Sequence, residues 1–380
     1  MHSDVPPGRC HPVGQATFEL GVDGYLSGTR IDRFLTRHFR NYSAFRMQRL
    51  VRCGLVLVDD QPAIINTRVF SGQTIRIRLA EPPDKLYAAE CQPLEIVYED
   101  PWLLVVNKPA GVVTHPVSDV QSGTLCNALQ FHLDQQTPRR GLLRPGMIHR
   151  LDRMTSGLLV VSKHHLAHRC LSIDFQERRV TKTYLALVNG VVEAEQGTID
   201  AHIGRVPRAD SILMSSDCDS RDAKPATTRF QVQRRWKNAT LLLATPLTGR
   251  LHQVRIHLAH HGHPVVGDAY YAAGGTIRTS AQQDPQRANS LRQHPRPAPG
   301  PRTALRHLLH ATQLAFHHPI SRKWMVFRAP AADDFLSAVR AWTRTTDSDP
   351  PHLALHAANS KAATVLQQPA SRAVDHVMDW

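Results

Sequence analysis

The stretch HRLDRMTSG (149–157) places two arginines, an aspartate, a threonine and a serine directly before the apolar run LLVV (158–161). A short run rich in Leu and Val is typical of a buried strand. The polar residues have two interpretations. They could be salt-bridged loop residues ahead of a core strand, or Asp152 could be a catalytic carboxylate that neighbouring cations keep ionised. Taken alone, the stretch favours the structural interpretation.

The segments around this strand predict a domain that mixes strands and helices. Strands are expected over 94–98 and 102–107 and within GLLVVSK, KTYLALVNG, TTRFQVQRRW, TLLLATP and KWMVFRAP. Helices are expected within TLCNALQFHL, HHLAHRCLSIDFQERRV and LHQVRIHLAHHG. The strands come in runs, without regular strand–helix alternation. We therefore expect an α+β domain over 94–344, with a mixed, largely antiparallel sheet flanked by helices.

A smaller module of two helices and two strands is expected over 28–80. Its first helix lies in TRIDRFLTRHF, and the second in SAFRMQRLVRCG has Ser43 as its N-cap and Gly54 as its stop. Phe45, Leu50 and Val51 are expected on one face of the second helix. A strand and a turn at Asp59-Asp60 follow, and then an alternating strand carries apolar residues at positions 75, 77 and 79.

Four other segments are expected to lack regular structure. They are a flexible N-terminal arm over 1–27, a linker over 81–93, a disordered insertion over 273–303 and a disordered C-terminal tail over 345–380. Each is aperiodic, and the insertion is rich in Gly, Pro, Gln and Arg.

The charge of the chain points to a polyanionic partner. The net charge is +14 and the pI is near 10.0, which favours binding to nucleic acid or to an anionic membrane. No apolar run reaches the length of a membrane span, and the first residues do not resemble a signal peptide. We therefore expect a cytoplasmic, monomeric protein that binds RNA and not a membrane.

The module over 28–80 contains ten arginines and three acids. Arg46, Arg49 and Arg52 recur every third residue of its second helix, a spacing that can follow a phosphate backbone. The alternative is a solvated helix face, which more often carries acids as well. We predict that these three arginines bind RNA.

Other kinds of chemistry have weaker support. Most glycoside hydrolases use two carboxylates, and no second acid lies near Asp152 in the sequence. Ser156 lacks the G-x-S-x-G motif of a serine nucleophile. His257 and His261 have a spacing that could hold a metal, but the H-E-x-x-H glutamate is missing. Neither a P-loop nor a G-x-G-x-x-G motif is present, so we expect no cofactor and no metal.

Four ordered blocks together resemble the RluA-type RNA pseudouridine synthases. They are VNKPAGVVTHP (106–116), HRLDRMTSGLLVVSK (149–163), KTYLALVNG (182–190) and PLTGRLHQVRIHLAHHGHPVVGDAYY (246–271). The late segment LRHLLHATQLAFHHPISRKWMVFRAP fits the same family. The module over 28–80 resembles the alpha-L RNA-binding motif, named from a small-subunit ribosomal protein, although VDDQ replaces the usual Asn-Gly turn. The resemblance covers about residues 28–335 of the chain.

The resemblance implies the pseudouridine synthase fold and a role for each site residue. Asp152 would be the catalytic aspartate, Tyr184 would lie against the target uracil and Arg255 would orient Asp152. Arg150 would enter the duplex as the target base leaves it, and Lys108 is a weaker candidate for an RNA contact. No role is predicted for Arg153.

The predicted function is isomerisation of specific uridines to pseudouridine, with large-subunit ribosomal RNA as the expected substrate and partner. One ionised carboxylate could attack the sugar or remove a sugar proton, and the sequence does not choose between them. Alternatives are a tRNA pseudouridine synthase of the same family and a non-catalytic RNA-binding or ribosome assembly factor. A hydrolase that uses Asp152 is disfavoured because a partner acid is missing.

Overall fold

The computed structural model describes residues 16–80, 83, 87–117, 120–137, 140–206, 214–216, 222–278 and 304–346. They belong to two compact units. The first contains the chain up to Pro93 together with 115–146 and 162–168. The second contains 94–114, 147–161 and the chain from Arg169 onward. Two segments inside the expected 94–344 domain thus group with the N-terminal residues.

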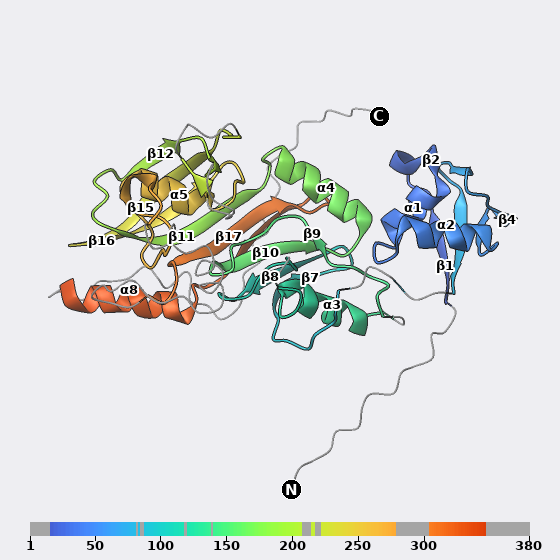
Figure 1. Ribbon diagram of the computed structural model, residues 1–380, viewed down its shortest axis with the longest axis horizontal. Coiled ribbons are helices and arrows are strands. Elements are labelled where there is room, and N and C mark those ends of the chain that lie inside the picture. Colours follow the sequence, from blue (N-terminus) through green and yellow to red (C-terminus); the bar gives the residue numbers. More distant parts are fainter. Residues whose placement is uncertain are drawn as a thin grey trace, which may run out of the picture. The chain divides into compact units, whose positions relative to one another are not determined.

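The N-terminal part of the first unit is a small sheet with two helices (Figure 1). The sheet order is β1-β6-β3-β4, formed by β1 (Ala16–Gly21), β3 (Val56–Val58), β4 (Gln61–Pro62) and β6 (Thr74–Leu79). The short strands β2 (Thr29–Arg30) and β5 (Arg68–Val69) form a separate pair. A 3-10 turn, η1 (Gly24–Leu26), follows β1, and the helices are α1 (Ile31–His38) and α2 (Ala44–Arg52).

Local sequence explains most of this module. The Ser43 hydroxyl accepts a hydrogen bond from the backbone N–H of Arg46, so it caps α2 as predicted. Asp59 and Asp60 both have positive φ in the tight turn between β3 and β4, which confirms the predicted turn. The alternation in β6 buries positions 75, 77 and 79 completely. Phe45 is 67% exposed whereas Leu50 and Val51 are buried, so the expectation that the three share one face of α2 is wrong. Met47 is buried with Leu50 and Val51 instead.

Three expected irregular segments are partly ordered. Residues 16–21 of the expected arm form β1, which pairs along its whole length with β6. The first residues of the expected insertion contain the 3-10 turn η2 (Ala273–Gly275), and a bridge joins Tyr271 to Ile277. An unpredicted helix, α8 (Asp333–Thr346), crosses the expected start of the tail. Residues 1–15, 279–303 and 347–380 of these segments lie outside the described residues.

The segments that group with the module include α3 (Leu125–Gln135), which Thr124 begins with a capping box. The amide of Asn41 donates to the carbonyl oxygens of Gly141 and Leu143. The hydroxyl of Tyr25 lies 2.6 Å from Nδ1 of His165. These long-range contacts explain why 115–146 and 162–168 belong to the first unit.

A mixed sheet of ten strands contains the predicted strands of the larger domain. Its main order is β12-β15-β16-β11-β17-β10-β8-β7, with β18 beside β17 and β9 beside β10. β10 and β17 run parallel, whereas β11 is antiparallel to both β16 and β17. The strands are β7 (Glu95–Glu99), β8 (Leu103–Lys108), β9 (Gly146–Met147), β10 (Ser156–Ser162), β11 (Thr181–Asn189), β12 (Gln196–Asp200), β15 (Thr227–Trp236), β16 (Ala239–Pro246), β17 (Leu309–His317) and β18 (Trp324–Arg328). A separate short pair consists of β13 (Gly204–Arg205) and β14 (Met214–Ser215).

Helices cover the two faces of this sheet. Val188 of β11 and Leu242 of β16 pack with Leu258 of α5 (Gln253–His260). The neighbouring strand residues, Leu187 and Leu241, pack in a different cluster with Phe335 and Val339 of α8. Because successive strand side chains point to opposite faces, α5 and α8 lie on opposite sides of these strands. Farther along the sheet, Leu171 of α4 (His165–Gln176) packs with residues of β8, β10 and β17. The α+β class with a mixed, largely antiparallel sheet is confirmed.

Candidate active site

Asp152 lies in the loop between β9 and β10, beside a cavity of about 720 Å³. Tyr184 of β11 and Arg255 of α5 line the same cavity. Arg150, the exposed residue predicted to enter the RNA duplex, also lines it. The structure therefore brings together four of the predicted site residues from three separate segments of the chain.

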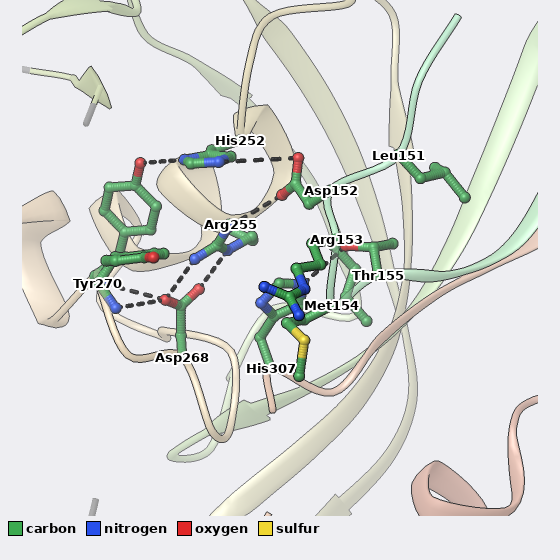
Figure 2. Close-up of polar contacts among 12 residues, drawn as sticks. Leu151, Asp152, Arg153, Met154, Thr155, His252, Arg255, Asp268, Tyr270 and His307 are labelled. Atoms are coloured by element: carbon green, nitrogen blue, oxygen red, sulfur yellow. Dashed lines mark hydrogen bonds and ion pairs between the residues drawn. The ribbon is translucent and has the colours of Figure 1, made fainter. Parts of the chain in front are cut away.

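The guanidinium of Arg255 lies between two carboxylates (Figure 2). Its Nη1 donates to Oδ2 of Asp152 at 3.0 Å, and its Nε and Nη2 donate to Asp268 at 2.7 and 2.8 Å. The Asp268 carboxylate also accepts the backbone N–H groups of Tyr270 and Tyr271. The side chain of Arg255 is 2% exposed and that of Asp268 is fully buried. A buried bidentate pair of this kind fixes the orientation of the third N–H group, which holds Asp152.

The Asp152 carboxyl is held in its charged form. Burial raises its pKa, but the positive charges of neighbouring groups outweigh burial and lower the pKa to about 2. His252 makes the largest of these contributions and Arg255 the next. Because burial lowers the pKa of His252 itself to about 4, that histidine is neutral at pH 7. At pH 7, therefore, Arg255 is the positive charge beside Asp152 that favours its ionised form, and His252 adds to this only at acid pH.

His252 lies at the N-terminal end of α5 with a left-handed backbone, φ 57°. Its Nε2 is 3.9 Å from Oδ1 of Asp152, and its Nδ1 is 2.7 Å from the hydroxyl of Tyr271. Non-glycine residues with positive φ are uncommon and are enriched at functional sites. This geometry presents the imidazole edge to the second oxygen of Asp152.

Tyr184 is half-buried on β11, where it packs against the apolar cluster that includes Ala186 and Val188. Burial, together with the negative charge of Asp152, raises the pKa of its phenol well above the usual value. The side chain is thus a neutral phenol at pH 7, which offers an aromatic face and a hydroxyl inside the cavity. The ladder between β11 and β17 shifts register between Thr183 and Tyr184. The extra residue, Thr312, lies in β17, so the alternation of side chains along β11 continues through Tyr184.

Hydrogen bonds from three directions fix the backbone of the Asp152 loop. The ammonium of Lys108 donates to the carbonyl oxygens of Pro109, Val112 and Arg153 at 2.8, 2.9 and 3.0 Å. The Thr114 hydroxyl donates to the carbonyl of Leu151. The guanidinium of Arg306 donates to the carbonyl of Met154. A loop braced in this way holds the Asp152 carboxylate in one place.

The expected RNA contact of Lys108 is contradicted by this geometry. Lys108 is fully buried, and its three donors are used by backbone carbonyls. Burial lowers its pKa to about 7, while the three acceptors favour the charged form, which alone has three N–H donors. Arg153, for which no role was predicted, donates from Nε to the carbonyl of Gly111. Both side chains stabilise the loop.

Gly157 is the last residue of the stretch HRLDRMTSG (149–157) and the second residue of β10. Its φ is +116°, and a Cβ atom there would lie 2.3 Å from the carbonyl oxygen of Ala311 in β17. Only glycine allows β10 to approach β17 this closely directly after the loop. The neighbouring Thr155 hydroxyl lies 2.8 Å from Nε2 of the buried His307.

Three predicted RNA-binding residues lie elsewhere. Arg46, Arg49 and Arg52 are on α2 of the first unit, where Arg46 is half-buried and the other two are exposed. The cavity belongs to the second unit, so these arginines are not part of the site around Asp152.

Sequence reasoning missed Asp268 and His252. A signal for Asp268 was present, because it is the single acid of the block 246–271 and a buried Arg255 requires an acidic partner. No comparable signal distinguishes His252 from the other histidines of the block. Its role depends on a left-handed helix start that the sequence does not reveal.

The two histidines considered as metal ligands, His257 and His261, lie in different surroundings. His257 is fully buried and its Nε2 lies 3.2 Å from the carbonyl oxygen of Ala201, whereas His261 ends α5 near the ring of Phe230. Within the described ranges, no three His, Cys, Asp or Glu side chains are grouped as metal ligands. In the same residues, no helix is long and apolar enough to span a membrane.

Comparisons with known proteins agree with the blocks that build this site. The family model for RNA pseudouridylate synthases matches residues 102–260. A ribosomal large subunit pseudouridine synthase D of Nitrosomonas europaea is 37% identical over 328 residues, which are 86% of this chain and 88% of that protein. The uncharacterized RNA pseudouridine synthase YlyB of Bacillus subtilis is 34% identical over 310 residues, which are 82% of this chain and 93% of that protein. A solved structure of human RNA pseudouridylate synthase domain containing 1 is 28% identical with a TM-score of 0.47, over 69% of this chain and 99% of that one.

Proposed function

The chain belongs to the RNA pseudouridine synthase family and is therefore an RNA isomerase, and from this premise we propose that it converts uridines of large-subunit ribosomal RNA to pseudouridine with Asp152 as the catalytic carboxylate. Several relatives are ribosomal large subunit pseudouridine synthases D, which supports this choice of RNA. The observation that carries the assignment of Asp152 is its ionised, oriented carboxylate at a cavity wall.

The reaction breaks the bond between C1′ of the ribose and N1 of the uracil and forms a bond from C1′ to C5 of the same base. A proton leaves C5 and a proton is gained at N1, so the change is an isomerisation. An ionised Asp152 can either attack C1′ or accept a sugar proton. Both routes require an ionised carboxylate, which Arg255 favours at neutral pH.

Tyr184 is proposed to hold the uracil while it is detached. Its aromatic face lies in the same cavity as Asp152, and its phenol keeps its proton at neutral pH. A neutral phenol can donate a hydrogen bond to the base and pass a proton from C5, but it is not a strong base by itself. The raised pKa therefore supports a positioning and relay role.

The target base must leave its stack before it can reach this cavity, which costs a few kcal/mol. We propose that Arg150, which is exposed at the cavity, occupies the space that the base leaves. Phosphate contacts of a protein with net charge +14 offset part of the cost.

The test is site-resolved pseudouridine mapping of total RNA from cells with and without the protein. We expect one or more uridines of large-subunit ribosomal RNA to lose modification when the protein is absent. If only tRNA sites lose modification, the proposed substrate is wrong and the tRNA alternative replaces it.

A further inference from the structure

Lys182 is a cation inside the catalytic cavity that the mechanism above does not use. Lys182 and Tyr184 line the cavity, and the intervening Thr183 does not. Residues two apart on a strand point to the same face and are separated by about 7 Å. Lys182 therefore lies one such step along β11 from the tyrosine that faces the uracil.

The charge of Lys182 is poorly compensated. Among the described residues, no acceptor or acid forms a hydrogen bond or an ion pair with its ammonium; the contact it makes is with the ring of Phe175, 5.7 Å from the centroid. Burial lowers its pKa to about 8. Lys108, by contrast, has three carbonyl acceptors. A half-buried cation without an acceptor is unfavourable in the free protein, which points to an anion that arrives with the substrate.

The rest of the cavity supports an anionic ligand near Lys182. Among the described residues that line it, Asp152 is the single acid, and that carboxylate is already paired with Arg255. Arg150 and Arg178 lie at exposed positions, and Arg250 points toward the carbonyl of Pro225. Lys182 is the cation deeper in the cavity that has no protein oxygen to bind.

We propose that Lys182 binds a phosphate group that flanks the target uridine in the RNA backbone. The inference rests on the proposed function, because Asp152 and Tyr184 define where the ribose and the base lie. When the base of a nucleotide lies against Tyr184, the phosphate groups on either side of that nucleotide lie only a short distance from the base. The step of about 7 Å from Tyr184 to Lys182 along β11 is of similar length. The contact is an electrostatic anchor that keeps the flipped nucleotide in the cavity while its base is detached.

The experiment pairs a change in the protein with a change in the RNA. The RNA is an oligomer around the uridine identified by the mapping above, prepared with normal phosphates or with a neutral methylphosphonate on the 5′ or the 3′ side of that uridine. The proteins are the wild type, Lys182→Met and Lys182→Arg. Lys237→Met is the control, since it removes the same charge at an exposed position outside the cavity. Both kcat/KM and equilibrium affinity are measured.

For the wild type, one of the two methylphosphonates should lower kcat/KM about ten- to a hundredfold, the range expected for a hydrogen bond to a charged group. Lys182→Met should show the same loss with normal RNA and no further loss with that methylphosphonate. Lys182→Arg should keep much of the activity, and Lys237→Met should behave as the wild type. The inference is overturned if neither methylphosphonate affects the wild type, or if Lys182→Met remains as sensitive as the wild type. If Lys182→Met is less active with normal RNA but remains as sensitive to the methylphosphonate as the wild type, Lys182 contacts the uracil and not a phosphate.

These outcomes are distinguishable from failure of the proposed function. A target uridine in tRNA, or full activity of Asp152→Asn, would contradict the proposed function without changing the methylphosphonate comparison. Conversely, equal sensitivity of wild type and Lys182→Met would remove the phosphate contact and leave the role of Asp152 intact.

Discussion

Arg255 is the residue on which the ionisation of Asp152 depends. Its buried guanidinium binds Asp268 with two N–H groups and Asp152 with a third. A lysine has one point charge and lacks the planar fork that matches two carboxylates. At this position an Arg-to-Lys change therefore alters the electrostatics of the Asp152 carboxyl as well as its orientation.

We predict that Arg255→Lys lowers kcat/KM at pH 7 by at least about tenfold and adds an acid limb to its pH profile. In the wild type the pKa of Asp152 is about 2, so the required carboxylate is fully ionised from pH 5 to 8. With the guanidinium lost, burial raises this pKa, and activity is then lost as pH falls through the new value. The measurement is kcat/KM between pH 5 and 8. A variant profile parallel to that of the wild type would contradict the explanation.

Lys108 shows how a single residue supports an element, the loop between β9 and β10. We predict that Lys108→Met lowers kcat by at least about tenfold and destabilises the fold by a few kcal/mol, because buried carbonyl groups lose their donors. RNA affinity and its salt dependence should stay unchanged, since the side chain is buried. Urea unfolding, turnover and binding at several salt concentrations test this together. A smaller salt slope in Lys108→Met would restore the RNA contact expected from the sequence.

The helix α2 is the second element with a prediction of its own. We predict that Arg46, Arg49 and Arg52 bind phosphate, so replacing all three with Gln should reduce the slope of log K against log salt by about 2 to 3. The control replaces three exposed basic residues of the second unit, Arg229, Lys237 and Lys323, with Gln, which removes the same charge. An equal change of slope in both variants would mean that net charge, and not α2, determines the effect.

At the element scale, periodicity predicted most strands and helices but not their limits. The alternation in TIRIRL and the apolar run after Gly157 gave β6 and β10 because one or both faces of each strand are buried. β1 was missed because its partner, β6, is more than 50 residues away in the chain, and local sequence does not reveal that pairing. The exposed Phe45 was misplaced because helical spacing alone does not say which face is buried.

At the scale of the whole molecule, the site residues come from segments that are far apart in the chain. Local sequence gives Asp152, Tyr184 and Arg255 no special status, and the family blocks identified them. The hydrogen bonds of His252 and Lys108 depend on tertiary packing, so the sequence could not assign them. Asp268, by contrast, is the single acid of the block 246–271 and could have been found. The excess of basic residues, by contrast, is visible in composition alone and fits the RNA substrate of the family.

The most direct test of the account is pseudouridine formation by purified Asp152→Asn in large-subunit ribosomal RNA from cells that lack the protein. Asp200→Asn, an exposed acid at the end of β12, is the matched control. We predict that Asp152→Asn binds this RNA with the affinity of the wild type but forms pseudouridine at least about a thousandfold more slowly, because the amide is neither a nucleophile nor a base. Modification by Asp152→Asn at the rate of the wild type and of Asp200→Asn would contradict the central claim.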